Sequence, residues 1–112
     1  MTAVDGDLVE VIDEPARQRY EARIGDRVAG FTEYRAMRGR VILVHTEVDP
    51  QFEGRGIGSR LASGALDDIR ARGLKVTVKC PFIAAYLKRH PDYLDLVAGE
   101  PDAGAARQAG AE

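Results

Sequence analysis

Three alternating glycines are the residues of this chain whose type and spacing point most directly to a chemistry. Gly54, Gly56 and Gly58 stand between a predicted strand and a predicted helix. Small residues there let backbone N–H groups approach an anion, and the start of a helix adds a favourable partial positive charge. The ligand that suits this arrangement is a phosphate or diphosphate group.

Two nucleotide-binding motifs do not fit this glycine segment. A dinucleotide fingerprint requires a third small residue at a fixed offset, and neither Ser59 nor Leu61 supplies it in the two possible registers. The P-loop is excluded because no Gly-Lys-Ser/Thr ends the segment. A plain flexible turn is the alternative. However, a glycine inside a helix costs about 1 kcal/mol relative to alanine, and a turn alone does not require that cost.

Few other side chains could do chemistry. The chain has one cysteine, Cys80, which cannot form an intramolecular disulfide, and two histidines, too few for a Cys/His zinc site without carboxylates. We therefore expect no metal site. His45 falls late in a predicted strand, on the face of Val41 and Leu43, where it could also be an ordinary core or rim histidine.

Hydrophobic periodicity predicts the strands that must position these residues. Segments rich in Val, Ile and Tyr run from Leu8 to Ile12 and from Arg17 to Ile24, separated by a turn-like Asp13-Glu14-Pro15. Two further strands are predicted on other grounds: Val28 to Met37 has aromatic and small residues without clean alternation, and the apolar run that starts at Val41 continues to Val48 before Pro50. Together they predict a meander of about four antiparallel strands with short hairpin loops.

The pattern becomes helical after the glycine segment. Apolar residues recur there at every fourth position and predict an amphipathic helix, namely Ile57, Leu61, Ala65 and Ile69. A short strand over residues 74–79 and a second helix from Pro81 to His90 follow. Residues 100–112 lack large apolar side chains and predict a disordered tail, so residues 1–99 form the predicted single domain.

Composition limits the class of partner. Sixteen Lys and Arg against eighteen Asp and Glu give a formal net charge of -2, without the basic field that non-specific nucleic-acid binding needs. No apolar run approaches the length of a membrane span, and no basic segment precedes an apolar one at the N-terminus. We expect a cytoplasmic protein that binds neither nucleic acid nor membrane.

The glycine segment resembles the signature of the GNAT superfamily of acyl-CoA-dependent N-acyltransferases, Gln/Arg-x-x-Gly-x-Gly/Ala. The matching positions are read as Glu53 to Gly58, with Glu53 in place of the first Gln or Arg. A branch of very small GNAT-like proteins is the most similar, and its motifs here are His45-Thr46-Glu47-Val48, the glycine segment, and Cys80-Pro81-Phe82 followed by Tyr86 and His90-Pro91.

The resemblance implies an α/β (α+β) fold with a bent, mixed, mostly antiparallel sheet and two main helices. It also implies acetyl-CoA (coenzyme A) as the acyl donor, with main-chain N–H groups making most of the phosphate contacts. The residues implied in cofactor binding are Thr46, Glu47, Val48, Gly54, Arg55, Gly56, Ile57, Gly58, Ser59 and Lys88.

The resemblance implies three catalytic residues. Acyl transfer from a thioester to an amine needs a neutral amine, a polarised carbonyl and a proton for the departing thiolate. Cys80 either accepts the acyl group or donates a proton to the leaving sulfur, and Tyr86 could also be that acid. His45 orients or deprotonates either Cys80 or the amine, and the backbone N–H of Val48 could donate to the thioester carbonyl.

Two functions follow, and they differ in class. The first is an N-acetyltransferase that moves an acetyl group from acetyl-CoA to a primary amine, carried by a small molecule or by a protein or peptide lysine. The second is a non-catalytic acyl-CoA-binding module, which needs the glycine segment but neither Cys80 nor His45. A site for some other nucleotide is a third reading, and it predicts competition by ATP or NAD.

Overall fold

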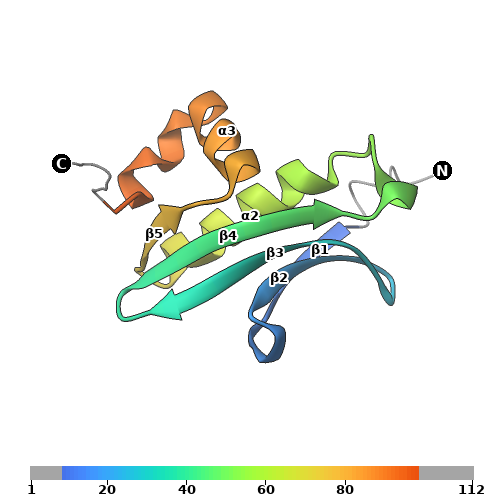
Figure 1. Cartoon of the computed structure of the whole chain (residues 1–112), viewed down its shortest axis with the longest axis horizontal. Coiled ribbons are helices and arrows are strands. Elements are labelled where there is room, and N and C mark those ends of the chain that lie inside the picture. The colour runs from blue at the N-terminus through green and yellow to red at the C-terminus, as the bar shows by residue number, and fades with distance from the viewer. Residues whose placement is uncertain (1–8, 99–112) are drawn as a thin grey trace.

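A five-stranded sheet is the frame of the computed structural model, which describes residues 9–98. The sheet has the order β1-β2-β3-β4-β5, and it curls as Figure 1 shows. The first four strands form an antiparallel meander, whereas β5 pairs parallel to β4. The strand bounds are β1 Val9–Glu14, β2 Arg19–Ile24, β3 Arg27–Met37, β4 Arg40–Val48 and β5 Lys75–Val78.

Two helices complete the fold. The longer one, α2 (Ile57–Ala71), connects β4 to β5 and packs across the sheet, and α3 (Pro81–Arg89) follows β5 and packs beside α2. Three short 3-10 turns join the elements, namely η1 (Pro15–Arg17), η2 (Pro50–Phe52) and η3 (Pro91–Leu96). The four apolar positions predicted for the first helix are all buried in the core. The predicted fold class is therefore confirmed.

One boundary differs from the sequence prediction. β1 continues through Asp13 and Glu14, where a turn-like break was expected, and the chain reverses only at η1. Both carboxylates have partners that explain this, because Asp13 accepts hydrogen bonds from Tyr34 and Arg72, and Glu14 accepts one from Arg23. Polar residues of turn-forming type are thus held in a strand by contacts with β2, β3 and the end of α2.

Gly30 on β3 shows which face of the sheet lies against α2. A Cβ atom added there would lie 3.2 Å from side-chain atoms of Ile57 and Leu61 on α2, so Gly30 faces the helix. Because side chains alternate along a strand, Thr32 also faces α2, and Phe31 and Glu33 face away. We name these the helix face and the outer face.

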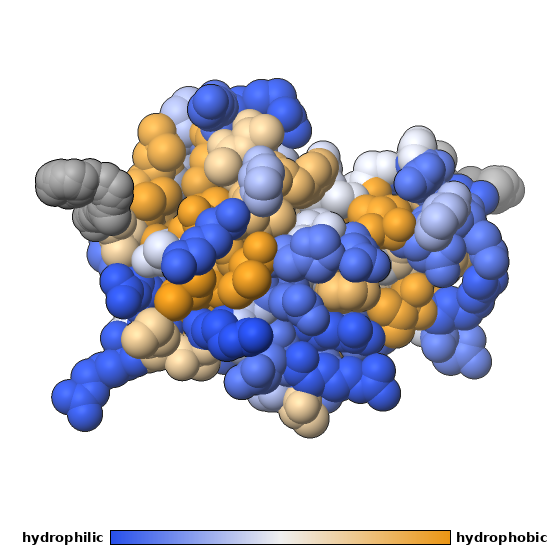
Figure 2. Space-filling model, viewed as in Figure 1, coloured by the Kyte–Doolittle hydropathy of each residue, from blue (hydrophilic) through white to orange (hydrophobic). Residues whose placement is uncertain are grey.

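The surface is mixed in character. On the side of the molecule shown in Figure 2, hydrophilic residues predominate, and apolar ones gather in one patch over the β4 and β5 side and another near the end of β4. No helix within residues 9–98 is long and apolar enough to cross a membrane.

The predicted tail, residues 100–112, lies outside the described residues, and the domain boundary at residue 99 stays a prediction.

We predict that Gly64→Ala destabilises the fold. Gly64 lies on α2 directly over β1, and an added Cβ would come within 2.7 Å of the Cβ of Val11. Overpacking of this kind costs about 1–3 kcal/mol, which outweighs the higher helix propensity of alanine. Denaturant titration should show a loss of unfolding free energy. The neighbouring Ser63→Ala should change little, because within residues 9–98 the Ser63 hydroxyl bonds only to the carbonyl of Arg60. A Gly64→Ala protein as stable as wild type would contradict the β1–α2 packing.

Candidate functional site

The glycine segment forms a turn that opens into α2. Gly54 and Gly56 have φ values of 83° and 77°, in the left-handed region that glycine adopts without strain. Gly56 is the N-cap of α2, and no side chain in the described part of the chain caps the helix. Its carbonyl accepts the amide of Arg60 at 3.0 Å. The amides of Ile57, Gly58 and Ser59 therefore have no acceptor within the helix and can bind an anion.

The third glycine serves a different purpose. A Cβ at Gly58 would lie 2.6 Å from Cζ of Phe82, so the start of α3 packs directly against the first turn of α2. The Phe82 side chain is nevertheless partly exposed. Cys80 stands two residues before Phe82 in the chain, so this contact holds the segment that carries Cys80 close to the first turn of α2.

The parallel pair β4–β5 separates part of the way along β4. Pairing ends at Leu43 and Val78, and the carbonyl of Leu43 accepts the amides of both Lys79 (2.9 Å) and Cys80 (3.1 Å). From there the chain turns into α3, while β4 continues to Val48. Beyond Leu43, no strand among residues 9–98 pairs with the edge of β4 opposite β3.

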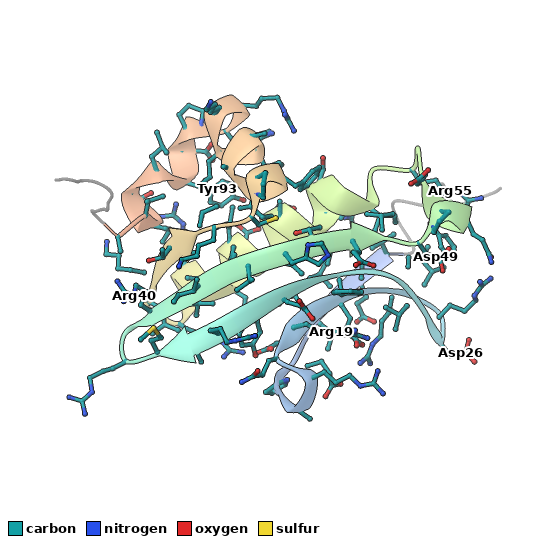
Figure 3. All side chains as sticks on the ribbon, in the orientation of Figure 1. Arg19, Asp26, Arg40, Asp49, Arg55 and Tyr93 are labelled. Carbon is teal, nitrogen blue, oxygen red and sulfur yellow. The ribbon has the colours of Figure 1, made fainter. Side chains whose placement is uncertain are left out.

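This edge carries unused backbone groups. The amide of Asp49 donates to the carbonyl of Ala29 on the β3 side at 2.8 Å. Since consecutive residues of a strand point their amides to alternate edges, Val48 and Thr46 point theirs to the open edge. Figure 3 shows Arg55 and Asp49 at the end of the molecule where β4 ends and the glycine turn begins.

Cys80 lies next to this edge, on the helix face. It is 2% exposed and forms the N-cap of α3. Its thiol donates to Oγ1 of Thr46 at 3.3 Å, and that oxygen lies 3.0 Å from Oγ1 of Thr32 on β3. Thr32 is completely buried. The structure thus brings Cys80 and Thr46 together, and it adds Thr32, which sequence reasoning missed.

His45 lies on the opposite side of the sheet from Cys80. It pairs with Glu33 and points outward, and its Nε2 lies 2.9 Å from Oε2 of Glu47. Its ring also meets Phe31 edge-on, with the centroids 6.4 Å apart. About half of the His45 side chain is exposed, so an incoming molecule could reach it.

The expectation that His45 shares a face with Val41 and Leu43 is wrong. The β3–β4 register shifts between Glu33 and Tyr34, and this leaves Val44 as an extra residue on β4. A bulge of one residue exchanges the two faces from that point onward. Val41 and Leu43 are buried on the helix face, whereas His45 follows the bulge and faces outward.

The remaining predicted site residues divide into three groups. Tyr86 is buried on α3, where its ring stacks on His90 (centroids 4.1 Å apart) and lies near Tyr93, and within residues 9–98 it makes no hydrogen bond to Cys80. Ile57 is buried in the core, so only its backbone can meet a ligand. The exposed ones are Gly54, Arg55, Gly56, Ser59, Glu47 and Lys88.

The register of the glycine signature needs a correction. Three positions before Gly54 is Gln51, not Glu53, so the glutamine of the signature is present. Gln51 lies in η2, where its amide donates to the side chain of Asp49 and its Oε1 accepts a hydrogen bond from Arg27. These contacts fix the turn that precedes α2.

A separate hollow of about 490 Å³ lies near β1, β2 and the start of β3. Its charges are largely paired with one another. Burial alone raises the pKa of Glu21, but the hydrogen bonds and charges of Arg23 and Arg19 outweigh burial, so this pKa lies below its ordinary value. The lining residues are Glu14, Arg17, Glu21, Arg23, Gly25, Asp26 and Val28, and none is a candidate site residue.

Comparison with known sequences gives the family. Residues 19–96 match the family model described as GCN5-related N-acetyl-transferase. Protein NATD1 of Mus musculus is 35% identical over 89 residues, which cover 77% of this chain and 80% of the mouse protein. Protein NATD1 of Danio rerio is 30% identical over 94 residues, which cover 80% and 84%.

Comparison with solved structures agrees on the fold. A GCN5-like protein from Staphylococcus aureus has a TM-score of 0.62 at 19% identity, covering 86% of this chain and 94% of that protein. Ard1 from Thermoplasma volcanium has a TM-score of 0.51 at 22% identity, covering 64% and 53%. Since the family model spans most of the described residues and the sequence relatives match most of their own length, this chain belongs to the GCN5-related N-acetyltransferase family.

Proposed function

We propose that this protein is an N-acetyltransferase that moves an acetyl group from acetyl-CoA to a primary amine. The observation that carries the proposal is the juxtaposition of two sets of unused amides. One set opens the helix α2, and the other lines the free edge of β4 beside Cys80. Family membership supports acetyl transfer as the reaction class.

The two sets of amides suit different parts of coenzyme A. The amides of Ile57, Gly58 and Ser59 would hold the diphosphate, helped by the positive end of the α2 dipole. The backbone of Thr46 would hold an amide group of the pantetheine arm, as an added strand holds to a sheet edge, and the amide of Val48 would donate to the carbonyl of the thioester. In this proposal Glu47 contributes only its backbone, because its side chain pairs with His45 on the outer face.

The charged candidates have secondary roles in the proposal. Lys88 is exposed on α3 and would approach a phosphate only as a mobile surface charge. Arg55 lies with its guanidinium carbon 5.5 Å from the ring centre of Phe52, at the turn that carries the uncapped amides. Its charge favours an anion there.

His45 is proposed as the base for the amine. The sequence left two partners open, Cys80 and the incoming amine, and the position of His45 on the outer face favours the amine. The carboxylate of Glu47, 2.9 Å away, fixes the ring and stabilises the imidazolium that forms when a proton arrives. An ammonium that approaches the outer face meets these two half-exposed side chains first.

Cys80 is proposed as the acid for the leaving sulfur. Its thiol donates a hydrogen bond to Thr46, and its burial limits direct attack. The amine gives one proton to His45, its nitrogen forms the bond to the acyl carbon, and it then releases a second proton. The bond from carbon to sulfur breaks, the leaving sulfur takes a proton from Cys80, and Cys80 regains one from solvent, so one proton is released overall.

The acceptor approach is open in the described residues. β1 and β2 are joined only by the three-residue turn η1, so no helix from this connection covers the sheet. An open approach suits a protein or peptide lysine or a polyamine. A panel of such amines, monitored by release of the CoA thiol, would identify the acceptor class.

The anion site predicts opposite effects of one substitution on stability and binding. Ser59→Glu places a carboxylate in the first turn of α2, where it stabilises a helix but repels a diphosphate. We expect an unchanged or higher melting temperature and an affinity for CoA about tenfold lower, which is about 1.4 kcal/mol. Ser59→Gln, of similar size without charge, should retain the wild-type affinity in calorimetric titration. Equal CoA affinity of the Glu and Gln variants would place the diphosphate elsewhere.

The catalytic role of Cys80 separates an enzyme from a binding module. We expect Cys80→Ala to keep CoA affinity and to lose single-turnover acetyl transfer, and Cys80→Ser to keep part of it because a hydroxyl can still donate a proton. Mass spectrometry without an amine should find no acetyl group on Cys80. Wild-type protein that binds acetyl-CoA but transfers to no amine would favour the non-catalytic module, and competition by ATP or NAD without preference for CoA would favour another nucleotide.

The open edge of β4 predicts different outcomes for two substitutions of Val48. Val48→Pro removes an amide that bonds to no other strand among residues 9–98, so the fold should tolerate proline at this edge. The same substitution removes a donor to the bound acyl group. We expect transfer to be abolished and the circular dichroism spectrum to be retained. Val48→Ile keeps the amide and should keep turnover. Full activity in a folded Val48→Pro protein would show that this amide is not used.

A further inference from the structure

The hydroxyl of Thr32 makes one hydrogen bond within residues 9–98. Thr32 is fully buried among apolar side chains on the helix face of β3, and its one hydrogen-bond partner within residues 9–98 is Oγ1 of Thr46, 3.0 Å away. A buried donor without an acceptor costs about 1–3 kcal/mol, whereas an idle lone pair costs less. Either hydroxyl could donate at this distance, and the lower cost assigns the donor role to Thr32 and the acceptor role to Thr46.

The geometry of the sheet makes this contact close. Thr32 and Thr46 face each other in the β3–β4 register. The amide of Asp49 bonds to Ala29, which places these two threonines in a pair without backbone hydrogen bonds between them. Side chains come closest in such pairs. The position of the Thr46 hydroxyl is thus fixed by the strands themselves.

Thr46 then receives two hydrogen bonds and has one proton left to give. Its oxygen accepts from Thr32 and from the thiol of Cys80, which uses both lone pairs. Its own O–H has no acceptor among residues 9–98. Thr46 is only partly buried, and it lies on β4 beyond the point where β5 separates. A molecule bound along the open edge is the acceptor that this O–H can reach.

We propose that the Thr46 hydroxyl is a preset hydrogen-bond donor to the acyl carbonyl oxygen, and that the buried Thr32 is the positioning residue that aims it. This inference rests on the proposed function. Negative charge develops on that oxygen as the amine nitrogen bonds to the acyl carbon, and a donor already held in place by two others costs no reorganisation at that moment. Thr32 itself touches neither substrate.

The test uses three threonine variants. Thr32→Val removes the hydroxyl and keeps the branched shape, Thr32→Ser keeps the hydroxyl, and Thr77→Val removes a hydroxyl on β5 that makes no hydrogen bond within residues 9–98. We expect kcat to fall about tenfold or more in Thr32→Val, to stay within about threefold of wild type in Thr32→Ser, and to be unchanged in Thr77→Val. A purely structural role would not be restored by serine in this way.

Binding provides a second readout that does not need turnover. Thr32→Val should weaken acetyl-CoA binding several-fold, on the order of 1 kcal/mol, and leave the affinity for CoA, which has no acyl carbonyl, unchanged. This comparison still applies if wild type binds acetyl-CoA without transferring it, an outcome that would count against the proposed function alone. If Thr32→Val does not fold, Thr46→Val removes the donor directly and carries the same expectations.

Two results would overturn the inference while the proposed function stands. One is wild-type kcat in a folded Thr32→Val or Thr46→Val protein. The other is an equal loss of affinity for acetyl-CoA and CoA in Thr32→Val, which would indicate a general disturbance of the edge rather than a lost contact with the acyl carbonyl.

Discussion

The separation of β5 from β4 at Leu43 is the constraint on which the candidate site depends. One carbonyl accepts two successive amides there, so the chain leaves the sheet and enters α3 while β4 continues. Had pairing continued to Val48, the amides of Thr46 and Val48 would be used within the sheet, and Cys80 would be an ordinary strand residue. A local change in hydrogen bonding thus produces both the free edge and the position of the thiol beside it.

The start of α2 carries a second set of unused groups, at some cost to stability. A good side-chain cap stabilises a helix by about 1 kcal/mol, and Gly56 supplies none. The other end of α2 is held firmly instead. Tyr20 donates to Asp68 at 2.7 Å, Arg72 bonds to Asp68 and to Asp13, and Tyr34 also donates to Asp13. A helix anchored at its C-terminal end can leave its N-terminal amides free for a ligand.

Much of the fold could be predicted from periodicity, and the parts that could not have local causes. Apolar spacing predicts α2, because burial on one face leaves a regular trace in the sequence, and residue type together with turn signals predicts all five strands. The bulge at Val44 leaves no such trace, because it arises from pairing with β3, and His45 was therefore assigned to the wrong face. The continuation of β1 through Asp13 was missed because its partners, Tyr34 and Arg72, are distant in the sequence.

The candidate site was less predictable than the fold for a related reason. A resemblance in short motifs names residues one at a time, whereas the contacts between them depend on register. Thr46 and Cys80 meet in the structure, but the residue that completes their contact, Thr32, lies in a segment without any motif. The available signal was the alternation along β3, which places a polar Thr32 on the same face as Gly30 and Tyr34.

The buried and partly buried hydroxyl groups of this domain differ in whether their hydrogen bonds are satisfied within the fold. The buried tyrosines at the far end of α2 stay protonated, because burial and the neighbouring carboxylates of Asp68 and Asp13 raise the pKa of Tyr20 and of Tyr34 well above the ordinary value. Those hydroxyls are fully used within the fold. Thr46 differs because, with Thr32 assigned as the donor in their 3.0 Å contact, two donors converge on its oxygen and its own proton has no acceptor in the described residues. Because Thr46 is only partly buried, water can accept from this hydroxyl in the free protein, and a ligand bound along the open edge of β4 would take the place of that water.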